Sequence, residues 1–94
     1  MAIQSFRCNH TRRLFETGKS QKFGSIRDVA MRKLAMLDNA PTLRSLESPP
    51  GNHFKEMVYD RKGQHSIRIS ELWRLCFVWT EAGPTEVEIT NHYA

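Results

Sequence analysis

The chain lacks the features that mark membrane, secreted and zinc-binding proteins. No stretch approaches the roughly 20 consecutive apolar residues of a membrane-spanning helix, and residues 1–6 have no apolar signal-peptide core. The two cysteines lie far apart, and the four histidines are scattered without metal-ligand spacing. We therefore expect a cytoplasmic protein with reduced thiols, with no metal or other cofactor and no membrane contact.

What the chain does have is an excess of positive charge in a short sequence. Its 94 residues predict one domain over 1–94. Chains of this size bury only about 60–70% of the surface that they expose when unfolded, so the core is limited. The net charge of +4 favours an anionic partner, such as nucleic acid, the ribosome or an acidic protein.

Two helices are predicted in the first half of the chain. The first covers residues 10–17, and Gly18 is placed to end it. The second covers residues 26–39, where apolar residues recur at helical spacing, and it stops before Pro41. The run Ser25-Ile-Arg-Asp28 resembles a capping box at its start.

Short strands dominate the rest of the chain. Residues 2–7 are a candidate opening strand, and a turn is expected through Gly83-Pro84. Helices that precede an antiparallel meander indicate an α+β fold with the helices on one face of the sheet. The four strands of the meander are predicted at residues 54–59, 64–70, 73–79 and 86–93.

Strand alternation brings two arginines together. A hairpin centred on Glu71 pairs Arg68 with Arg74 on the face away from the helices. Directly opposed like charges destabilise a sheet, so something must compensate. A bound phosphate is one candidate, and pairing with Glu86 and Glu88 of the next strand is the other. The apolar positions on the helix-facing side are Ile67, Ile69, Trp73, Leu75, Phe77 and Trp79.

The histidines near the sheet differ in their predicted surroundings. His65 shares the parity of the apolar face, which indicates a histidine in the core or at its rim. His92 follows the last strand between Asn91 and Tyr93. Because histidine titrates near neutral pH, His92 can act as a general acid or base.

Three segments of the sheet region resemble the HigB toxins of the RelE superfamily. They are Gly63-Gln-His-Ser-Ile-Arg-Ile69, Trp73-Arg-Leu-Cys-Phe-Val-Trp79 and Val87-Glu-Ile-Thr-Asn-His-Tyr93. The resemblance extends over nearly the whole chain. It implies a RelE-like α+β fold with a short N-terminal strand, two helices on one face, and an antiparallel sheet ending in a four-strand meander.

The resemblance also implies a function. HigB toxins belong to bacterial toxin–antitoxin pairs and act as ribosome-dependent endoribonucleases that cleave translated mRNA and inhibit growth. The implied partners are the ribosome with its mRNA and a HigA-type antitoxin with a helix-turn-helix domain. Operator DNA is contacted only through the antitoxin complex. The alternative from the residues themselves is a non-catalytic basic module that binds RNA or an antitoxin.

Site residues carry over from the family one position at a time. Arg74 matches the strand arginine that contacts the scissile phosphate, and Arg68 lies where relatives place a strand lysine. The resemblance, with the chemistry of each side chain, indicates four catalytic candidates: His92, Arg74, Arg68 and Tyr93. The RNA-binding candidates are Asn91, Lys55, His53, Arg61 and Lys62.

The chain departs from its relatives at two places. Many HigB chains end the last strand with Asp-Tyr-His, whereas this chain has Asn91-His92-Tyr93, so the imidazole and the phenol exchange positions. Some also have a lysine where this chain has Val58. We expect the loss of this cation either to weaken catalysis or to shift its role to Lys55 or Arg61.

Overall fold

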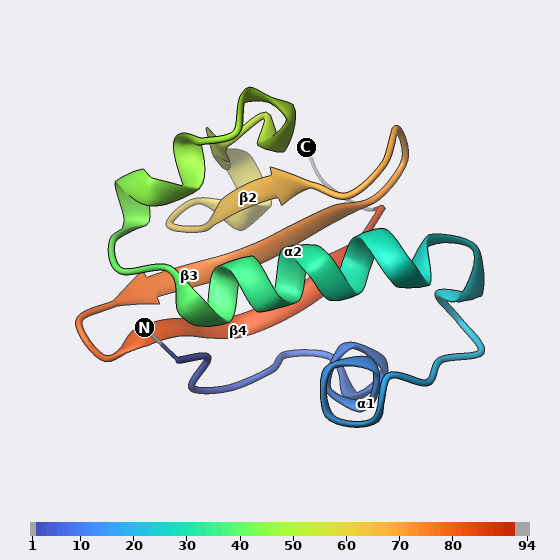
Figure 1. Cartoon of the computed structure of the whole chain (residues 1–94). Helices are drawn as coiled ribbons and strands as arrows, with labels where there is room; N and C mark the ends of the chain where they lie inside the picture. The colour runs from blue at the N-terminus through green and yellow to red at the C-terminus, as the bar shows by residue number, and fades with distance from the viewer. Residues whose placement is uncertain (1, 92–94) are drawn as a thin grey trace.

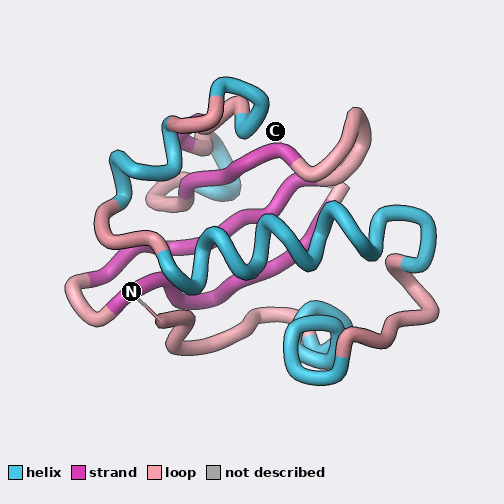
Figure 2. Tube along the Cα trace, viewed as in Figure 1, coloured by secondary structure: helices cyan, strands magenta, loops and turns pink. Residues whose placement is uncertain are grey.

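The helices lie together on one face of a four-stranded antiparallel sheet, with α2 running across β3 and β4 (Figure 1). The computed structural model describes residues 2–91. Short 3₁₀ helices connect the longer elements, and Figure 2 separates these helical turns from the strands and loops by colour. The predicted α+β fold is confirmed. Its main elements are α1 (Asn9–Thr17), α2 (Arg27–Asn39), β1 (Lys55–Glu56), β2 (His65–Arg68), β3 (Arg74–Thr80) and β4 (Gly83–Thr90).

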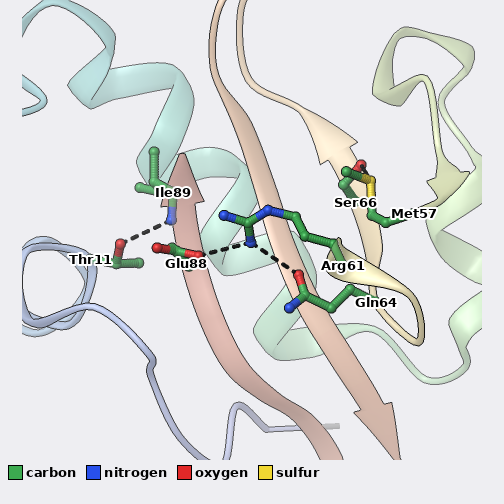
Figure 3. Close-up of polar contacts among 7 residues, drawn as sticks. All are labelled: Thr11, Met57, Arg61, Gln64, Ser66, Glu88 and Ile89. Carbon is green, nitrogen blue, oxygen red and sulfur yellow. Dashed lines mark hydrogen bonds and ion pairs between the residues drawn. The ribbon is translucent and has the colours of Figure 1, made fainter. Parts of the chain in front are cut away.

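Helix α1 ends where the sequence predicts. Gly18 adopts φ 72°, and its backbone N–H donates to the carbonyl of Leu14 at 2.8 Å. Glycine reaches this left-handed conformation without the steric penalty of a Cβ atom. The other side of the helix is tied to the sheet, because the Thr11 hydroxyl accepts a hydrogen bond from the backbone N–H of Ile89 at 3.0 Å (Figure 3).

The predicted capping box of α2 does not form. A 3₁₀ turn, Gly24–Ile26, precedes the helix, so the N-cap position falls on Ile26 and no side chain caps it. Because Ser25 lies inside that turn, its hydroxyl does not cap the helix. Asp28 pairs instead with Arg27 at 2.8 Å. The other end agrees with the prediction, since α2 stops at Asn39, before Pro41.

The core lies between α1, α2 and the helix-facing side of the sheet. Alternation along β2 and β3 is confirmed, because the predicted apolar positions Ile67, Leu75 and Phe77 are fully buried in one cluster. Residues of the helices, of the turn before α2 and of β4 complete the cluster, which contains the buried side chains of Leu14, Phe23, Ala30, Leu34, Leu37, Leu46, Val87 and Ile89.

The strand bounds differ most from the prediction at two turns of the chain. The first meander strand shrinks to β1 because the chain enters a 3₁₀ helix, η4 (Tyr59–Arg61), directly after Val58. The last turn falls at residues 81–82, and Gly83 and Pro84 belong to β4.

The opening segment is also less regular than predicted. Residues 2–7 contribute one parallel bridge, between Phe6 and Val87, and not a regular strand. Backbone bonds from Gln4 to Pro84 at 2.8 Å and from Arg7 to Val87 at 3.1 Å hold this segment beside β4. It therefore extends the sheet locally without completing a fifth strand.

A β-bulge interrupts the pairing of β3 and β4. Cys76 pairs with Glu88 and Val78 with Thr85, so Glu86 and Val87 both lie opposite Phe77. Glu86 adopts φ 50° at this point and is exposed. The bulge therefore separates Glu86 from the regular alternation that placed it beside the arginines in the prediction.

Candidate RNA-binding face of the sheet

Polar and charged side chains gather on the face of the sheet away from the helices. The register aligns them in two neighbouring rows, because residues paired across antiparallel strands point to the same side. The first row is Lys55, Ser66, Cys76 and Glu88, from β1 to β4. The second row is Arg68, Arg74 and Thr90. The predicted pairing of Arg68 with Arg74 is therefore confirmed.

Arg74 is held by several hydrogen bonds and is only 7% exposed. Its Nε donates to the Ser66 hydroxyl at 2.7 Å, and its Nη2 donates to the Ser66 carbonyl at 3.3 Å. Nη2 also donates to the carbonyl of His53. These contacts hold the guanidinium in one orientation. Ser66 was not among the predicted site residues, although it has the same strand parity as the arginines.

Arg68 has a different environment from its opposed neighbour. Its side chain is half-buried and has no hydrogen-bond or ion-pair partner within residues 2–91. The carboxylate of Glu88 pairs with Arg61, and Glu86 is exposed at the bulge. The predicted neutralisation of Arg68 by these two glutamates is therefore wrong in the part of the chain that the structure describes.

Arg61 reaches across β3 from the β1–β2 connection (Figure 3). Its Nη1 donates to Glu88 Oε1 at 3.0 Å and to Gln64 Oε1 at 3.2 Å. The Arg61 and Glu88 side chains are 14% and 22% exposed, so water screens this ion pair only in part. The pair fastens the β1–β2 connection onto the polar face.

The Cys76 thiol lies fully buried beneath these charges. Burial raises its pKa above the usual 9.0, and the cations Arg61, Arg74 and Lys55 only partly offset that effect. The thiol therefore stays protonated at neutral pH and is a poor nucleophile.

Asn52 fixes the turn that carries His53. It is fully buried, and its amide nitrogen donates to the Leu46 carbonyl at 3.0 Å and to the Ser48 carbonyl at 3.3 Å. Its amide oxygen accepts from Lys33 Nζ on α2, and burial lowers the pKa of Lys33. Asn52 thus links α2 to the turn whose next carbonyl accepts from Arg74. Asn52 was not among the predicted site residues, because a polar residue in a loop gives no sequence signal of burial.

The other predicted RNA-binding residues have exposed side chains. His53 adopts φ 42° and its side chain is exposed. The side chains of Lys55, Lys62 and Asn91 are exposed on β1, in the β1–β2 connection and just after β4, respectively. The predictions for His92 and Tyr93 concern positions outside the described residues, 2–91.

His65 lies on the core side, as its strand parity predicts. Its ring stacks between Phe54, with centroids 5.4 Å apart, and Phe77, at 6.4 Å. Its Nδ1 is buried without a hydrogen-bond partner in the described chain. Aromatic packing, and not hydrogen bonding, therefore holds this histidine.

Residues 2–91 contain no second site of the kinds that metal ions or membranes require. No group of three or more His, Cys, Asp or Glu side chains there is arranged to hold a metal ion. No described helix is both long and apolar enough to cross a bilayer. A cavity of about 540 Å³ beside α1 contains none of the predicted site residues; its lining is Asn9, His10, Arg13, Lys19, Ser20 and Gln21.

Comparison with known proteins agrees with this architecture. Residues 4–93 match the family model of the RelE-like toxin of type II toxin–antitoxin system HigB. Toxin HigB-1 of Vibrio cholerae serotype O1 is 34% identical over 94 residues, which cover 98% of each chain. Both matches extend over nearly the full length and include the rows described above. The chain therefore belongs to the HigB family of RelE-like toxins of type II toxin–antitoxin systems.

Proposed function

We propose that this toxin is a ribosome-dependent endoribonuclease that cleaves translated mRNA and thereby inhibits growth. The observation that carries the proposal is the opposed pair Arg68 and Arg74 on the polar face of the sheet. Two guanidinium groups so placed suit the oxygens of a single phosphate. Lys55 adds positive charge to the first row, where the charges of Arg61 and Glu88 offset each other, and this suits the backbone of a bound RNA strand.

The reaction transfers a phosphoryl group from the 5′-oxygen of one nucleotide to the 2′-oxygen of the nucleotide before it. The 2′-hydroxyl attacks the adjacent phosphorus, so an O2′–P bond forms while the P–O5′ bond breaks. A base takes the proton of the 2′-hydroxyl and an acid gives one to the leaving 5′-oxygen. The products are a 2′,3′-cyclic phosphate and a 5′-hydroxyl end. Arg68 and Arg74 stabilise the charge that develops on the phosphate oxygens.

Proton transfer needs groups other than the arginines, which stay protonated at all physiological pH values. We assign it to His92, with Tyr93 placed to stack on a base or to orient the 2′-hydroxyl. So few catalytic groups favour a reaction in which the ribosome holds the mRNA in line for attack. A HigA-type antitoxin neutralises the toxin, and the complex of the two binds operator DNA.

A non-catalytic binding module is the second candidate. It is favoured by the absence of any histidine from the two rows, as described for residues 2–91, and by the protonated state of Cys76. Such a module would bind RNA or the antitoxin through the same cations without cutting a strand. The two candidates differ in one observable, the appearance of new RNA ends.

Mapping RNA 5′ ends in cells tests the proposal. Expression of the toxin without an antitoxin is expected to slow growth and to produce new 5′ ends inside translated reading frames. Arg68→Ala, expressed at the same level, is the matched control and should produce few such ends. Slowed growth by the wild-type toxin with no new ends in reading frames would establish the binding module instead.

A further inference from the structure

Tyr59 is the most exposed large apolar residue identified in the described chain. Its side chain is 81% exposed, against 67% for Leu72 and 49% for Val58. It has no hydrogen bond, ion pair or ring contact to another side chain among residues 2–91. A tyrosine ring with no packing partner contributes little to the stability of the fold.

The backbone at Tyr59 is also unusual. Its φ is 57°, in the left-handed region that glycine and asparagine adopt most readily. Two other non-glycine residues among residues 2–91 have positive φ, and each has a structural explanation: the His53 carbonyl accepts from Arg74, and Glu86 forms the bulge. At position 59, glycine or asparagine would adopt the same backbone conformation at a lower conformational free energy. Strain of this kind tends to persist where a side chain has a function.

The turn that carries Tyr59 is firmly held. Backbone bonds join Arg61 to Val58 at 3.2 Å, Lys62 to Tyr59 at 3.1 Å and Gln64 to Arg61 at 2.9 Å. The Arg61 side chain then anchors this turn to Glu88 on β4 (Figure 3). The ring therefore projects from a backbone that is already ordered, which lowers the entropy lost when a ligand binds.

The charges around Tyr59 select the kind of ligand. The η4 turn carries Asp60 and Arg61, and Lys62 follows it. Because the Arg61 guanidinium is paired with Glu88, the exposed Lys62, which has no ion-pair partner among residues 2–91, is the cation that this turn offers to a ligand. Arg61 connects the turn to the polar face that holds Arg68 and Arg74. Aromatic rings beside cationic grooves bind single-stranded nucleic acids, because the bases stack on the ring while the cations contact the phosphates.

We propose that Tyr59 is a stacking platform for a base of single-stranded RNA that is bound along the polar face holding Arg68 and Arg74. The proposal rests on the RNA-cleaving function proposed above and adds a base contact outside the two rows. A stack on an aromatic face tolerates any base, so Tyr59 would contribute affinity and position and would not read sequence.

Equilibrium binding of a fluorescent single-stranded RNA to the purified toxin tests the contact without requiring cleavage. Tyr59→Ala should weaken binding by roughly tenfold or more, whereas Tyr59→Phe should change it by less than about twofold. Tyr59→Asn should bind RNA as weakly as Tyr59→Ala but melt at a higher temperature, because asparagine tolerates the backbone conformation. Leu72→Ala, which removes another exposed apolar side chain, is the control and should bind normally.

Single-turnover cleavage on programmed ribosomes separates this inference from the proposed function. If the wild-type toxin cleaves and Tyr59→Ala matches it in both cleavage and RNA binding, the stacking platform is wrong and the nuclease stands. If the wild-type toxin does not cleave but Tyr59→Ala still loses RNA binding, the nuclease is wrong and the platform stands. Normal RNA binding by Tyr59→Ala with loss of inhibition by the antitoxin would assign the ring to a protein interface. A wild-type toxin that binds no RNA, free or on the ribosome, overturns both proposals.

Discussion

Arg68 and Arg74 lie directly opposite each other on β2 and β3, yet one is tied down by hydrogen bonds and the other is not. Arg74 is 7% exposed and donates to Ser66 and to the turn at His53. Arg68 is half-buried without a partner among the described residues. Arg74 therefore also stabilises the fold, whereas the positive charge of Arg68 is not compensated by any described side chain. A bound phosphate would compensate that charge.

Arg68→Ala should reduce cleavage while leaving the melting temperature unchanged or slightly raised. The substitution removes a like charge opposite Arg74 and breaks no hydrogen bond among residues 2–91. Thermal unfolding and single-turnover cleavage on programmed ribosomes, measured on the same preparation, check both parts. A clear fall in melting temperature with normal cleavage per folded molecule would mean that Arg68 has a structural role.

Arg74→Ala should lose both cleavage and stability. Removing the guanidinium breaks its hydrogen bonds to the Ser66 hydroxyl and to the carbonyls of Ser66 and His53. An acceptor left unsatisfied in a buried position, as at the Ser66 hydroxyl, costs about 1–3 kcal/mol. Arg74→Lys keeps the charge but cannot reproduce the fork, so it should restore little cleavage. Ser66→Ala removes only the Nε acceptor and should show a smaller loss of each. Chemical denaturation with a cleavage assay checks the ranking, and a fully stable Arg74→Ala would contradict it.

Asn52→Ala should disturb the turn that supports Arg74 although position 52 lies outside the two rows. It removes the amide that bonds the carbonyls of Leu46 and Ser48 and accepts from Lys33. We expect a loss of about 2 kcal/mol or more in the free energy of unfolding. Asn39→Ala, which removes an exposed amide on α2, is the matched control and should change stability little. Equal stability of the two variants would remove Asn52 from the support of the site.

The Cys76 thiol should make folding stability depend on pH in the alkaline range. Its folded pKa is raised above the usual 9.0, so the unfolded chain loses this proton first as the pH rises. The stabilising contribution is therefore complete below about pH 9 and is lost as the pH rises through the folded pKa. Cys76→Ala should show a shallower alkaline decline than the wild type, and Cys8→Ser should keep the full decline. Urea unfolding at a series of pH values measures the slopes, and identical slopes for all three proteins would contradict this prediction.

Patterns of period two predicted the sheet well because burial depends on alternation. Ile67, Leu75 and Phe77 are in the core and Arg68 faces Arg74, as the residues alone imply. The same alternation did not predict local irregularities of the backbone. The bulge at Glu86 depends on a backbone conformation that alternation does not encode, and the capping box failed because a 3₁₀ turn displaced the helix start. The hydrogen bonds of Arg74 and Asn52 join segments distant in the chain, so no local pattern predicts them.

The exchanged order of His92 and Tyr93 yields the most discriminating test of the chemistry, at positions outside residues 2–91. If His92 transfers protons, His92→Ala should lower the single-turnover rate on programmed ribosomes by about 100-fold or more. If the exchange has moved that task to the phenol, Tyr93→Phe should be more harmful than His92→Gln, because only the hydroxyl is lost. If Tyr93 only stacks, Tyr93→Phe should be nearly neutral and Tyr93→Ala costly. The pH dependence of the rate adds an independent measure, since a histidine base or acid produces a limb near neutral pH that His92→Gln should abolish. Unchanged rates in all four variants, at unchanged ribosome affinity, would move proton transfer to another residue, with the exposed imidazole of His53 as the next candidate.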